Sequence, residues 1–414
     1  MDLKELKERF SRCECGEEHR LDIKDIAVGS GITADTGEIL RRNGFKKRLL
    51  LVADENTLSA ARGIESALSR FDVEFKIYKN LRQAEMSEAE KIRALAEKAE
   101  GIISVGTGSL NDICRMAAAK GNKPFAIYAT AASMDGFASY GAPLTDGNFK
   151  ATYPAKSPEV IIADTRVLAA APAVLKSAGF GDMVGKYTGL IDWQVSHILT
   201  GEYYCEKVAE LTRSAADRIT ALADRITADD EESAAAVFEA LLLTGIGMSF
   251  TRTSRPASGT EHILSHYWEC KKLLAGELSD FHGRKVGVAT LYIMRLYGEL
   301  YKKERVRAHG DTTNWEEVYA DYGALAPEVK RLNTPRTVTD GLDPAALERN
   351  WDKVREIIAS SPSYEEIRAA MIKAGCAMDN NDIGVSDKLR DSGLKYHPYM
   401  RNRMSLRRLL PMID

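Results

Sequence analysis

The chain has 414 residues, 44% of them hydrophobic, and its 57 basic and 60 acidic side chains give a net charge of −3. These values are typical of an ordinary globular protein of two domains, and the balanced charge excludes the basic surface that nucleic-acid binding requires. Since no apolar run approaches the roughly 20 residues of a membrane span and residues 1–9 lack a signal-peptide core, we expect a cytoplasmic protein without a membrane span.

Two cysteines and a histidine lie close together near the N-terminus, at Cys13, Cys15 and His19. Structural zinc takes four ligands, usually with two or more residues between paired cysteines. Here the gap is a single residue and no second Cys/His pair follows nearby, so we interpret the segment as an N-terminal turn and keep a metal site as the less favoured alternative. The six cysteines of the chain are too few and too scattered for a disulfide scaffold.

Short apolar runs alternate with helical patterns as far as residue 164. Four apolar runs that are typical of strands lie at residues 48–53, 101–105, 125–128 and 160–163, and residues 74–78 alternate like a fifth strand. Helices are predicted between them, at residues 57–70, 87–98 and 109–120. A stretch rich in Gly, Thr and Pro over residues 136–156 indicates an inserted hairpin or loop. Strands alternating with helices predict a doubly wound, parallel α/β domain over residues 1–165.

The turn after the third of these strands joins it to a helix through two glycines, in the order Gly106, Thr107, Gly108, Ser109, with Asp112 following. Glycines in this place let phosphate oxygens meet backbone N–H groups at the positive end of the helix. Because the third glycine of the dinucleotide fingerprint is missing, a tight structural turn is about as good an interpretation as a pyrophosphate site.

Two further polar groups follow predicted strands at the carboxyl ends, where open α/β sheets bind ligands. Asp54 follows the first strand and either accepts a bond from a ribose hydroxyl, which favours NAD over NADP, or merely caps the next helix. Thr130 and Ser133 follow the fourth strand as candidate nucleotide contacts, and Asp135 as a candidate contact to a substrate hydroxyl. A loop of small polar residues is nevertheless an ordinary turn more often than not.

Residues 166–414 carry long helical patterns and almost no strand-like alternation, which predicts a second, all-helical domain with a cleft between the two. Asp182 follows a Gly-Phe-Gly sequence and is expected to open a long helix, where a carboxylate is commonly an N-cap. The alternative is a metal ligand, because His262 and His282 each occupy a Gly-flanked helix entry. One Asp and two His make a metal site with an open position. His266 lies four residues beyond His262 and shares its face.

These motifs together resemble the iron-containing alcohol dehydrogenase superfamily and, within it, the glycerol-1-phosphate dehydrogenases, whose bacterial branch is the best match. The resemblance spans residues 50–290 and is carried by Val52-Ala-Asp-Glu-Asn-Thr57, Gly106-Thr-Gly-Ser-Leu-Asn-Asp112, Ala132-Ser-Met-Asp-Gly-Phe-Ala138, Gly179-Phe-Gly-Asp-Met-Val-Gly-Lys-Tyr-Thr188, Asp192-Trp193, Ser258-Gly-Thr-Glu-His262 and His282-Gly283. Each motif is weak alone, whereas their combination is specific. Archaeal members usually carry three glycines at residues 106–108, and this departure favours the bacterial branch.

The resemblance implies a Rossmann-like domain, a helical domain and one divalent metal in the cleft, either zinc, nickel or iron. Asp182, His262 and His282 match the family's ligands, and His266 lines the site beside them. The family reduces dihydroxyacetone phosphate to sn-glycerol 1-phosphate with NADH or NADPH, and its members are homodimers or larger homo-oligomers. The metal is then expected to polarise the carbonyl, and His266 or a metal-bound water to supply the proton.

The substrate phosphate requires cations. Lys186 is the first candidate, because it lies one helical turn from Asp182 on the same face. The next candidates are Lys150, Arg255 and Lys156. The remaining predicted substrate contacts, beside the metal, are Asp135, Asp182 and His266.

Two other kinds of function stay open. A glycerol dehydrogenase or a 3-dehydroquinate-synthase-like enzyme would share the superfamily, the cofactor and the metal. A non-catalytic nucleotide-sensing protein would keep the fold without the chemistry. The complete set of candidate ligands argues against a sensor, which need hold no stoichiometric metal.

Overall fold

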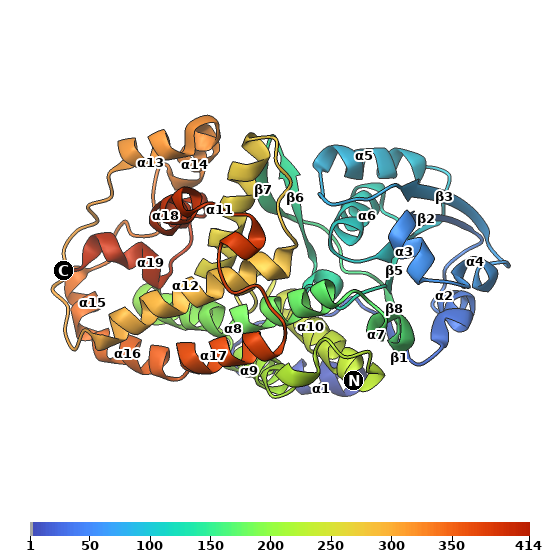
Figure 1. The fold of residues 1–414 in the computed structure, drawn as a ribbon, viewed down its shortest axis with the longest axis horizontal. Helices are drawn as coiled ribbons and strands as arrows, with labels where there is room; N and C mark the ends of the chain where they lie inside the picture. The colour runs from blue at the N-terminus through green and yellow to red at the C-terminus, as the bar shows by residue number, and fades with distance from the viewer. Residues whose placement is uncertain (1–2) are drawn as a thin grey trace.

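The computed structural model describes residues 3–414, in which a parallel sheet with flanking helices leads into a mainly helical part (Figure 1). The sheet has the strand order β1-β8-β5-β4-β2-β3. Its strands are β1 Asp25–Gly29, β2 Arg48–Asp54, β3 Asp72–Tyr78, β4 Gly101–Gly106, β5 Phe125–Ala129 and β8 Val160–Asp164. The five predicted strands and the α/β class are confirmed. The edge strand β1 was missed because its apolar run is only three residues long, from Ile26 to Val28.

The register of the sheet brings two of the polar turns together. Ala53 of β2 pairs with Val105 of β4, so Asp54 and Gly106 end neighbouring strands at the same edge. From β2 the chain moves outward to β3 and then returns to β4 on the other side of β2. The carboxyl edge between β2 and β4 is therefore a topological switch point, the place where open α/β sheets bind ligands.

Short helices connect the strands. They are α2 Thr36–Arg42, α3 Glu55–Ala60, α4 Ile64–Ala67, α5 Met86–Leu95 and α6 Gly108–Gly121. The single helix predicted over residues 57–70 is divided into α3 and α4 because Gly63 has a φ of +93°, which ends the first helix. The hairpin predicted over residues 136–156 is confirmed as β6 Gly141–Asp146 and β7 Phe149–Pro154.

After β8 the described chain continues almost entirely in helices. The first six are α7 Thr165–Ala169, α8 Ala173–Thr200, α9 Glu206–Thr220, α10 Glu231–Thr251, α11 Thr260–Leu274 and α12 His282–Lys302. The remainder are α13 Trp315–Tyr322, α14 Ala326–Asn333, α15 Pro344–Arg349, α16 Trp351–Ala359, α17 Tyr364–Lys373, α18 Asp387–Tyr396 and α19 Leu406–Leu409. The N-terminal helix α1, Leu3–Phe10, lies near α9 and α10 and away from the sheet (Figure 1).

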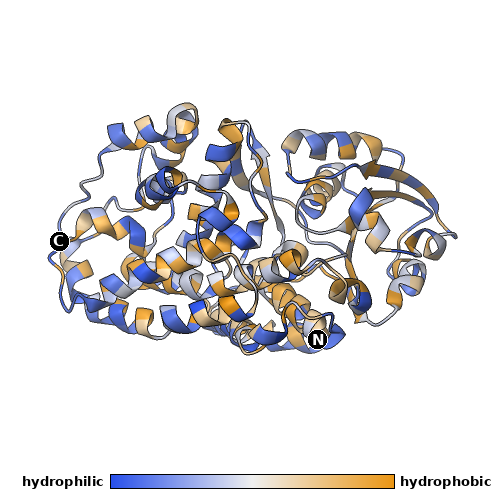
Figure 2. Ribbon diagram, viewed as in Figure 1, coloured by the Kyte–Doolittle hydropathy of each residue, from blue (hydrophilic) through white to orange (hydrophobic). Residues whose placement is uncertain are grey.

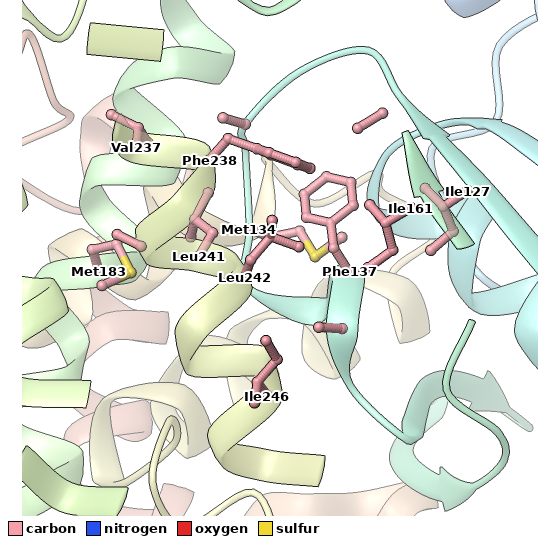
Figure 3. Packing of buried hydrophobic residues seen from close by; sticks show 14 of the residues in the cluster. Ile127, Met134, Phe137, Ile161, Met183, Val237, Phe238, Leu241, Leu242 and Ile246 are labelled. Atoms are coloured by element: carbon pink, nitrogen blue, oxygen red, sulfur yellow. The ribbon is translucent and has the colours of Figure 1, made fainter. Parts of the chain in front are cut away.

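One apolar cluster joins the sheet to the helices. Ile127 of β5 and Ile161 of β8 lie on one side of it, and Phe238 and Leu242 of α10 on the other (Figure 3). Phe137 stands between them, with its ring 4.9 Å from that of Phe238 in an edge-to-face contact. The core continues across residue 165, and the division of the chain into two domains at that position stays a prediction.

Helix α10 is as long and apolar as a membrane-spanning helix. By length and composition it could cross a membrane, with a mean hydropathy of 1.6, but 78% of that window is buried inside the protein. Most of its residues have the colour of hydrophobic side chains in Figure 2. It contacts α7, α8 and α9, which makes it the core helix of the second part.

Helix α8 differs from the sequence-based expectation. It runs without interruption from Ala173 to Thr200, so Asp182 lies fully buried inside it and the N-cap interpretation is wrong. The glycines before Asp182 are sites of close packing. A Cβ atom on Gly179 would lie 2.0 Å from the Ala132 carbonyl oxygen, and one on Gly181 would lie 2.4 Å from that of Gly283. The small residues let the loop after β5 and helix α12 touch the backbone of α8.

We expect Gly283→Ala to destabilise the protein, because the added Cβ would lie 1.9 Å from the carbonyl oxygen of Ala178. Separating α12 from α8 should cost about 1–3 kcal/mol, as overpacking does elsewhere, and should displace the neighbouring His282. Gly298→Ala on the same helix is the control, because its Cβ would meet nothing within 4 Å. Thermal melting tests the comparison, and equal melting temperatures for the two variants would contradict it.

Candidate active site

The three predicted metal ligands converge from three helices. Asp182 comes from α8, His262 from the first turn of α11 and His282 from the first residue of α12, and one ligand atom from each lies within 4.8 Å of the others. Nε2 of His262 is 3.3 Å from Oδ1 of Asp182, and the rings of His262 and His282 are 5.2 Å apart. Three protein ligands leave a coordination position open, which is typical of catalytic metal sites.

Asp192 fixes the point at which α11 begins. Its Oδ2 accepts hydrogen bonds from the backbone N–H of Thr260 at 2.8 Å and from the Thr260 hydroxyl at 2.7 Å. Its Oδ1 accepts one from the Tyr297 hydroxyl at 2.6 Å. Burial raises the pKa of Asp192 to about 6. Because Thr260 is the first residue of α11, a side chain of α8 caps this helix and so places His262 two residues further on.

Glu261 orients His262, and the sequence analysis gave it no role. Oε1 of Glu261 lies 2.6 Å from Nδ1 of His262 and also accepts a hydrogen bond from the N–H of Gly259 at 2.7 Å. Oε2 accepts one from the Thr188 hydroxyl at 2.7 Å. A carboxylate on Nδ1 leaves the lone pair of Nε2 facing Asp182, as metal-ligating histidines require. Its position next to a candidate histidine ligand was the signal available in the sequence.

Lys186 lies buried between two carboxylates. Its side chain is completely buried, and Nζ is 2.8 Å from Oδ1 of Asp182 and 2.6 Å from Oδ2 of Asp135. Burial alone would lower the pKa of Lys186, but the two carboxylates raise it. This geometry argues against the predicted phosphate contact, because the ammonium group already neutralises two acids, and the contact stays a prediction. Arg255 and Lys156 are hydrogen-bonded elsewhere, and neither is among the described residues that line the cleft.

Asp135 lies against the metal ligands from the opposite wall. Its backbone N–H donates a hydrogen bond of 2.9 Å to Oδ2 of Asp182, so the loop after β5 is attached directly to α8. Burial and the nearby charge of Asp182 raise the pKa of Asp135 above its usual range, against the opposing effect of Lys186. The loop of small polar residues therefore reaches the centre of the site.

Two other lysines reach the cleft and share one carboxylate. Nζ of Lys150 on β7 lies 2.8 Å from one oxygen of Glu269, and Nζ of Lys285 on α12 lies 2.6 Å from the other. All three side chains line the same cavity as His282. Burial lowers the pKa of Lys285, whereas Glu269 raises that of Lys150 against the effect of burial. Two ammonium groups and one carboxylate leave a net positive charge beside the metal ligands, and Lys285 was missed in the sequence.

A cavity of about 350 Å³ extends from the carboxyl edge of the sheet to these groups. This volume lies at the lower end of the usual range for small-molecule sites, about 300–1,000 Å³. The predicted site residues that line it are Asp54, Thr107, Gly108, Ser109, Ser133, Lys150 and His282. The candidate nucleotide contacts thus line the same cavity as His282, one of the candidate metal ligands.

The turn after β4 has the features of an anion site. Gly108 begins α6 with a φ of +27°, and a Cβ on it would meet nothing within 4 Å, so the turn is open on that side. The first N–H groups of a helix have no partners within it and attract negative charge. The hydroxyls of Thr107 and Ser133 lie 2.8 Å apart and tie this turn to the loop after β5.

Three predicted cofactor residues, Gly106, Asp112 and Thr130, are not among the described residues that line the cavity. The N–H of Thr130 donates to the carbonyl of Gly106 at 3.3 Å, which holds the two turns together. Asp112 is buried in α6, and burial raises its pKa to about 7. Direct nucleotide contacts of these three residues stay predictions.

Asp54 has the capping role that the sequence left open. Its Oδ1 accepts a hydrogen bond of 2.9 Å from the N–H of Thr57, and the Thr57 hydroxyl accepts one of 3.0 Å from the N–H of Asp54. This reciprocal pair is a capping box at the start of α3. The same carboxylate also lines the cavity, so capping and nucleotide recognition are compatible.

His266 completes the site. Its ring lies 5.7 Å from that of His282, and its Nε2 has no hydrogen-bond partner within residues 3–414. Burial, together with nearby Lys150 and Arg401, lowers the pKa of His266 well below its usual value. The imidazole is therefore neutral, with one nitrogen free to take or give a proton.

Known proteins similar to this chain form a consistent group. Residues 27–172 match the sequence profile of the iron-containing alcohol dehydrogenases. A glycerol-1-phosphate dehydrogenase (NAD(P)+) of Halalkalibacterium halodurans is 33% identical over 98% of this chain and 96% of its own length. The protein of that name from Geobacillus stearothermophilus is 30% identical over the same shares. The crystal structure of a probable glycerol dehydrogenase from Sinorhizobium meliloti has the same fold, with a TM-score of 0.57 and 19% identity over 91% of this chain and 97% of that one.

Proposed function

The chain belongs to the glycerol-1-phosphate dehydrogenases of the iron-containing alcohol dehydrogenase superfamily, and from this membership we propose that it reduces dihydroxyacetone phosphate to sn-glycerol 1-phosphate with NADH or NADPH. The observation that carries the proposal is the Asp182, His262 and His282 set, of which His282 lines the cavity that extends from the carboxyl edge of the sheet. A hydride donor and a carbonyl acceptor can meet in such a space.

The donor set fits a divalent metal such as zinc, nickel or iron. One carboxylate and two imidazoles are ligands that these metals accept, and Glu261 holds His262 with its free nitrogen toward Asp182. These three side chains would hold the metal, which would supply Lewis acidity for polarising the C2 carbonyl of the substrate.

The residues of the chain bind and orient the two reactants. The N-terminus of α6, with Thr107 and Ser109, receives the pyrophosphate of the dinucleotide, whose nicotinamide supplies the hydride. Ser133 holds the loop after β5 against this turn. Lys186 neutralises Asp135 and Asp182, and so keeps both carboxylates in place beside the histidine ligands.

His266 is the proposed source of the proton for the product hydroxyl. It is neutral and buried, and its Nε2 has no partner among the described residues. Because a neutral imidazole cannot give up a proton without receiving one, His266 would act as a relay: one ring nitrogen gives its proton to the product oxygen while the other takes one from water. Positioned proton transfer of this kind typically contributes about 10²–10⁴ to the rate.

The substrate phosphate is placed at Lys150 and Lys285. Both ammonium groups line the cavity beside His282, and Glu269 is shared between them. A plain glycerol dehydrogenase has no need of this cationic pair. The pair therefore favours the phosphorylated substrate over dihydroxyacetone, and we expect kcat/KM to be much higher for the phosphate.

Turnover of the two substrates tests the proposal. Metal-loaded protein should oxidise NADH when dihydroxyacetone phosphate is added and only slowly with dihydroxyacetone. Equal rates would indicate a glycerol dehydrogenase, and 3-dehydroquinate formation would indicate the other enzyme of the superfamily. No turnover with any of these substrates, in protein without stoichiometric metal in the cleft, would indicate a nucleotide sensor.

We expect Asp54→Ser to weaken the preference for NADH over NADPH. Serine keeps the helix cap but removes the negative charge that would repel a 2′-phosphate. The ratio of kcat/KM values for the two cofactors should fall by about tenfold or more, as the loss of a charged hydrogen bond predicts. Glu55→Gln, which removes the neighbouring exposed charge, should leave the ratio unchanged. An unchanged ratio in Asp54→Ser would leave this residue with its capping role alone.

We also propose that the protein works in the cytoplasm as a homodimer or larger homo-oligomer. All six cysteines are free, which suits a reducing compartment. Light scattering coupled to size exclusion gives the assembly state directly, and a monomeric mass at working concentration would contradict this part of the proposal.

A further inference from the structure

A second group of metal-binding side chains lies outside the cleft. Cys13, Cys15 and His19 come from the segment after α1, and Cys205 immediately precedes α9; one ligand atom from each lies within 4.8 Å of all the others. The sulfurs of Cys13 and Cys205 are 3.6 Å apart, and Nε2 of His19 lies 3.3 Å from the Cys15 sulfur and 3.5 Å from that of Cys205. The proposed enzyme activity does not use any of these four side chains.

Three of the six separations lie close to the edges of a zinc tetrahedron, and the other three are within 4.8 Å. With Zn–S bonds of about 2.3 Å and a Zn–N bond of about 2.0–2.1 Å, tetrahedral angles place two sulfurs about 3.8 Å apart and a sulfur and a nitrogen about 3.5–3.6 Å apart. The observed values of 3.6, 3.3 and 3.5 Å lie close to these lengths. A disulfide would bring two sulfurs to about 2.05 Å, and the four described side chains contain no such bond.

The surroundings orient the ligands as a metal site requires. Nδ1 of His19 lies 3.2 Å from the Phe250 carbonyl oxygen, to which it donates, so the lone pair of Nε2 faces the sulfurs. The imidazole packs against the rings of Phe10 and Phe250 at 5.6 and 5.4 Å. The Tyr203 hydroxyl lies 3.4 Å from the Cys15 sulfur, where it can donate to a thiolate. Hydrogen bonds between thiols are weak and would not by themselves make four groups converge.

The local backbone explains how a Cys-X-Cys pair can serve such a site. Gly16 has a φ of +82° and follows a turn in which its N–H donates to the carbonyl of Cys13 at 3.4 Å. The chain therefore reverses directly after Cys15 and returns His19 to the two sulfurs. The fourth group, Cys205, is distant in sequence. The sequence of the N-terminal segment therefore favoured a turn over a metal site.

We propose that Cys13, Cys15, His19 and Cys205 bind a structural zinc ion that attaches the N-terminal segment to the helical part of the protein. Three thiolates and one imidazole complete a tetrahedron and leave no open position, which is typical of structural and not catalytic zinc. The ion would hold α1, whose Phe10 is fully buried, against α9 and α10. Its binding free energy would then contribute to folding.

Metal content tests the proposal. Purified wild-type protein should contain one zinc ion in addition to the metal of the cleft, and Cys205→Ser should lose one equivalent while His262→Ala keeps the zinc. Cys376→Ser is the matched control, because this cysteine lies outside the cluster and its thiol donates only to the Ser177 carbonyl. Unchanged zinc content in Cys205→Ser would overturn the proposal.

Cobalt substitution distinguishes this site from the cleft. Only this group offers thiolates, so Co²⁺ bound here should give thiolate-to-cobalt charge-transfer absorption and intense tetrahedral visible bands. The absorption should persist in His262→Ala and disappear in Cys205→Ser. If Cys205→Ser does not fold, His19→Cys provides the second test, because four thiolates should retain the metal with a shifted spectrum. No thiolate absorption in cobalt-loaded wild-type protein, or formation of a Cys13–Cys205 disulfide in its place, would overturn the proposal.

Discussion

His262→Ala should lose the metal of the cleft and lower kcat/KM for dihydroxyacetone phosphate by about a thousandfold or more. The reason is that Lewis-acid polarisation of a carbonyl is worth several kcal/mol, and each 1.36 kcal/mol corresponds to about tenfold in rate. His262 is held between Glu261 and Asp182, so its removal takes away both a ligand and the contact that fixes its neighbours. Metal analysis and steady-state kinetics on the same preparation measure the two effects together.

The matched control is His266→Ala, on the same helix face. It should keep the cleft metal and lose only the proton-transfer contribution, so metal content separates the two variants even where their rates are similar. Chelation of the wild-type protein should abolish activity, and Ni²⁺ or Zn²⁺ should restore it. Wild-type metal content in His262→Ala would show that the ligand assignment is wrong.

Lys285→Met should raise KM for dihydroxyacetone phosphate and leave the slow turnover of dihydroxyacetone nearly unchanged. A charge-assisted hydrogen bond to a phosphate contributes roughly 1.5–3 kcal/mol, or about 10- to 150-fold in kcat/KM for each contact held in the transition state. Methionine keeps the length and apolar stem of lysine, so packing around the side chain should be preserved. Kinetics with both substrates measure the difference.

Lys186→Met is the contrasting variant. Because Lys186 is buried between Asp135 and Asp182, its loss leaves two unpaired carboxylates beside the metal ligands and should impair both substrates equally. If Lys285→Met also impaired both substrates equally, the phosphate would have to be bound by other groups, and Lys285 would support the metal site or the fold.

The sequence predicted the parts of the fold that follow from local patterns. The apolar runs gave four of the strands, because a buried parallel strand is hydrophobic along its whole length, and the edge strand β3 was found from the alternation over residues 74–78. The half-exposed edge strand β1 carries no such pattern. Asp182 was assigned to a helix start because glycine usually interrupts helices. In this protein the glycines of α8 allow contact with α12, and only the tertiary structure shows that.

The sequence predicted those site residues whose side-chain type allows few chemical roles. Asp182, His262 and His282 have few uses in common other than metal binding, whereas a lysine has many. The sequence placed Lys186 by helical spacing and had no means of seeing that two carboxylates enclose its ammonium group. The proposed roles of Lys285 and Cys205 depend on partners that are distant in the chain or on other elements. Sequence spacing alone cannot predict such contacts.

The stereochemistry of the product tests the central claim most directly. Metal-loaded protein is incubated with NADH and dihydroxyacetone phosphate until NADH consumption stops, and the glycerol phosphate formed is then offered to an enzyme that oxidises only sn-glycerol 3-phosphate. We predict NADH consumption that depends on the substrate phosphate, with a product that this second enzyme does not oxidise. His262→Ala should form no product. A product that the second enzyme oxidises, or the absence of NADH consumption by the metal-loaded protein, would contradict the proposed function.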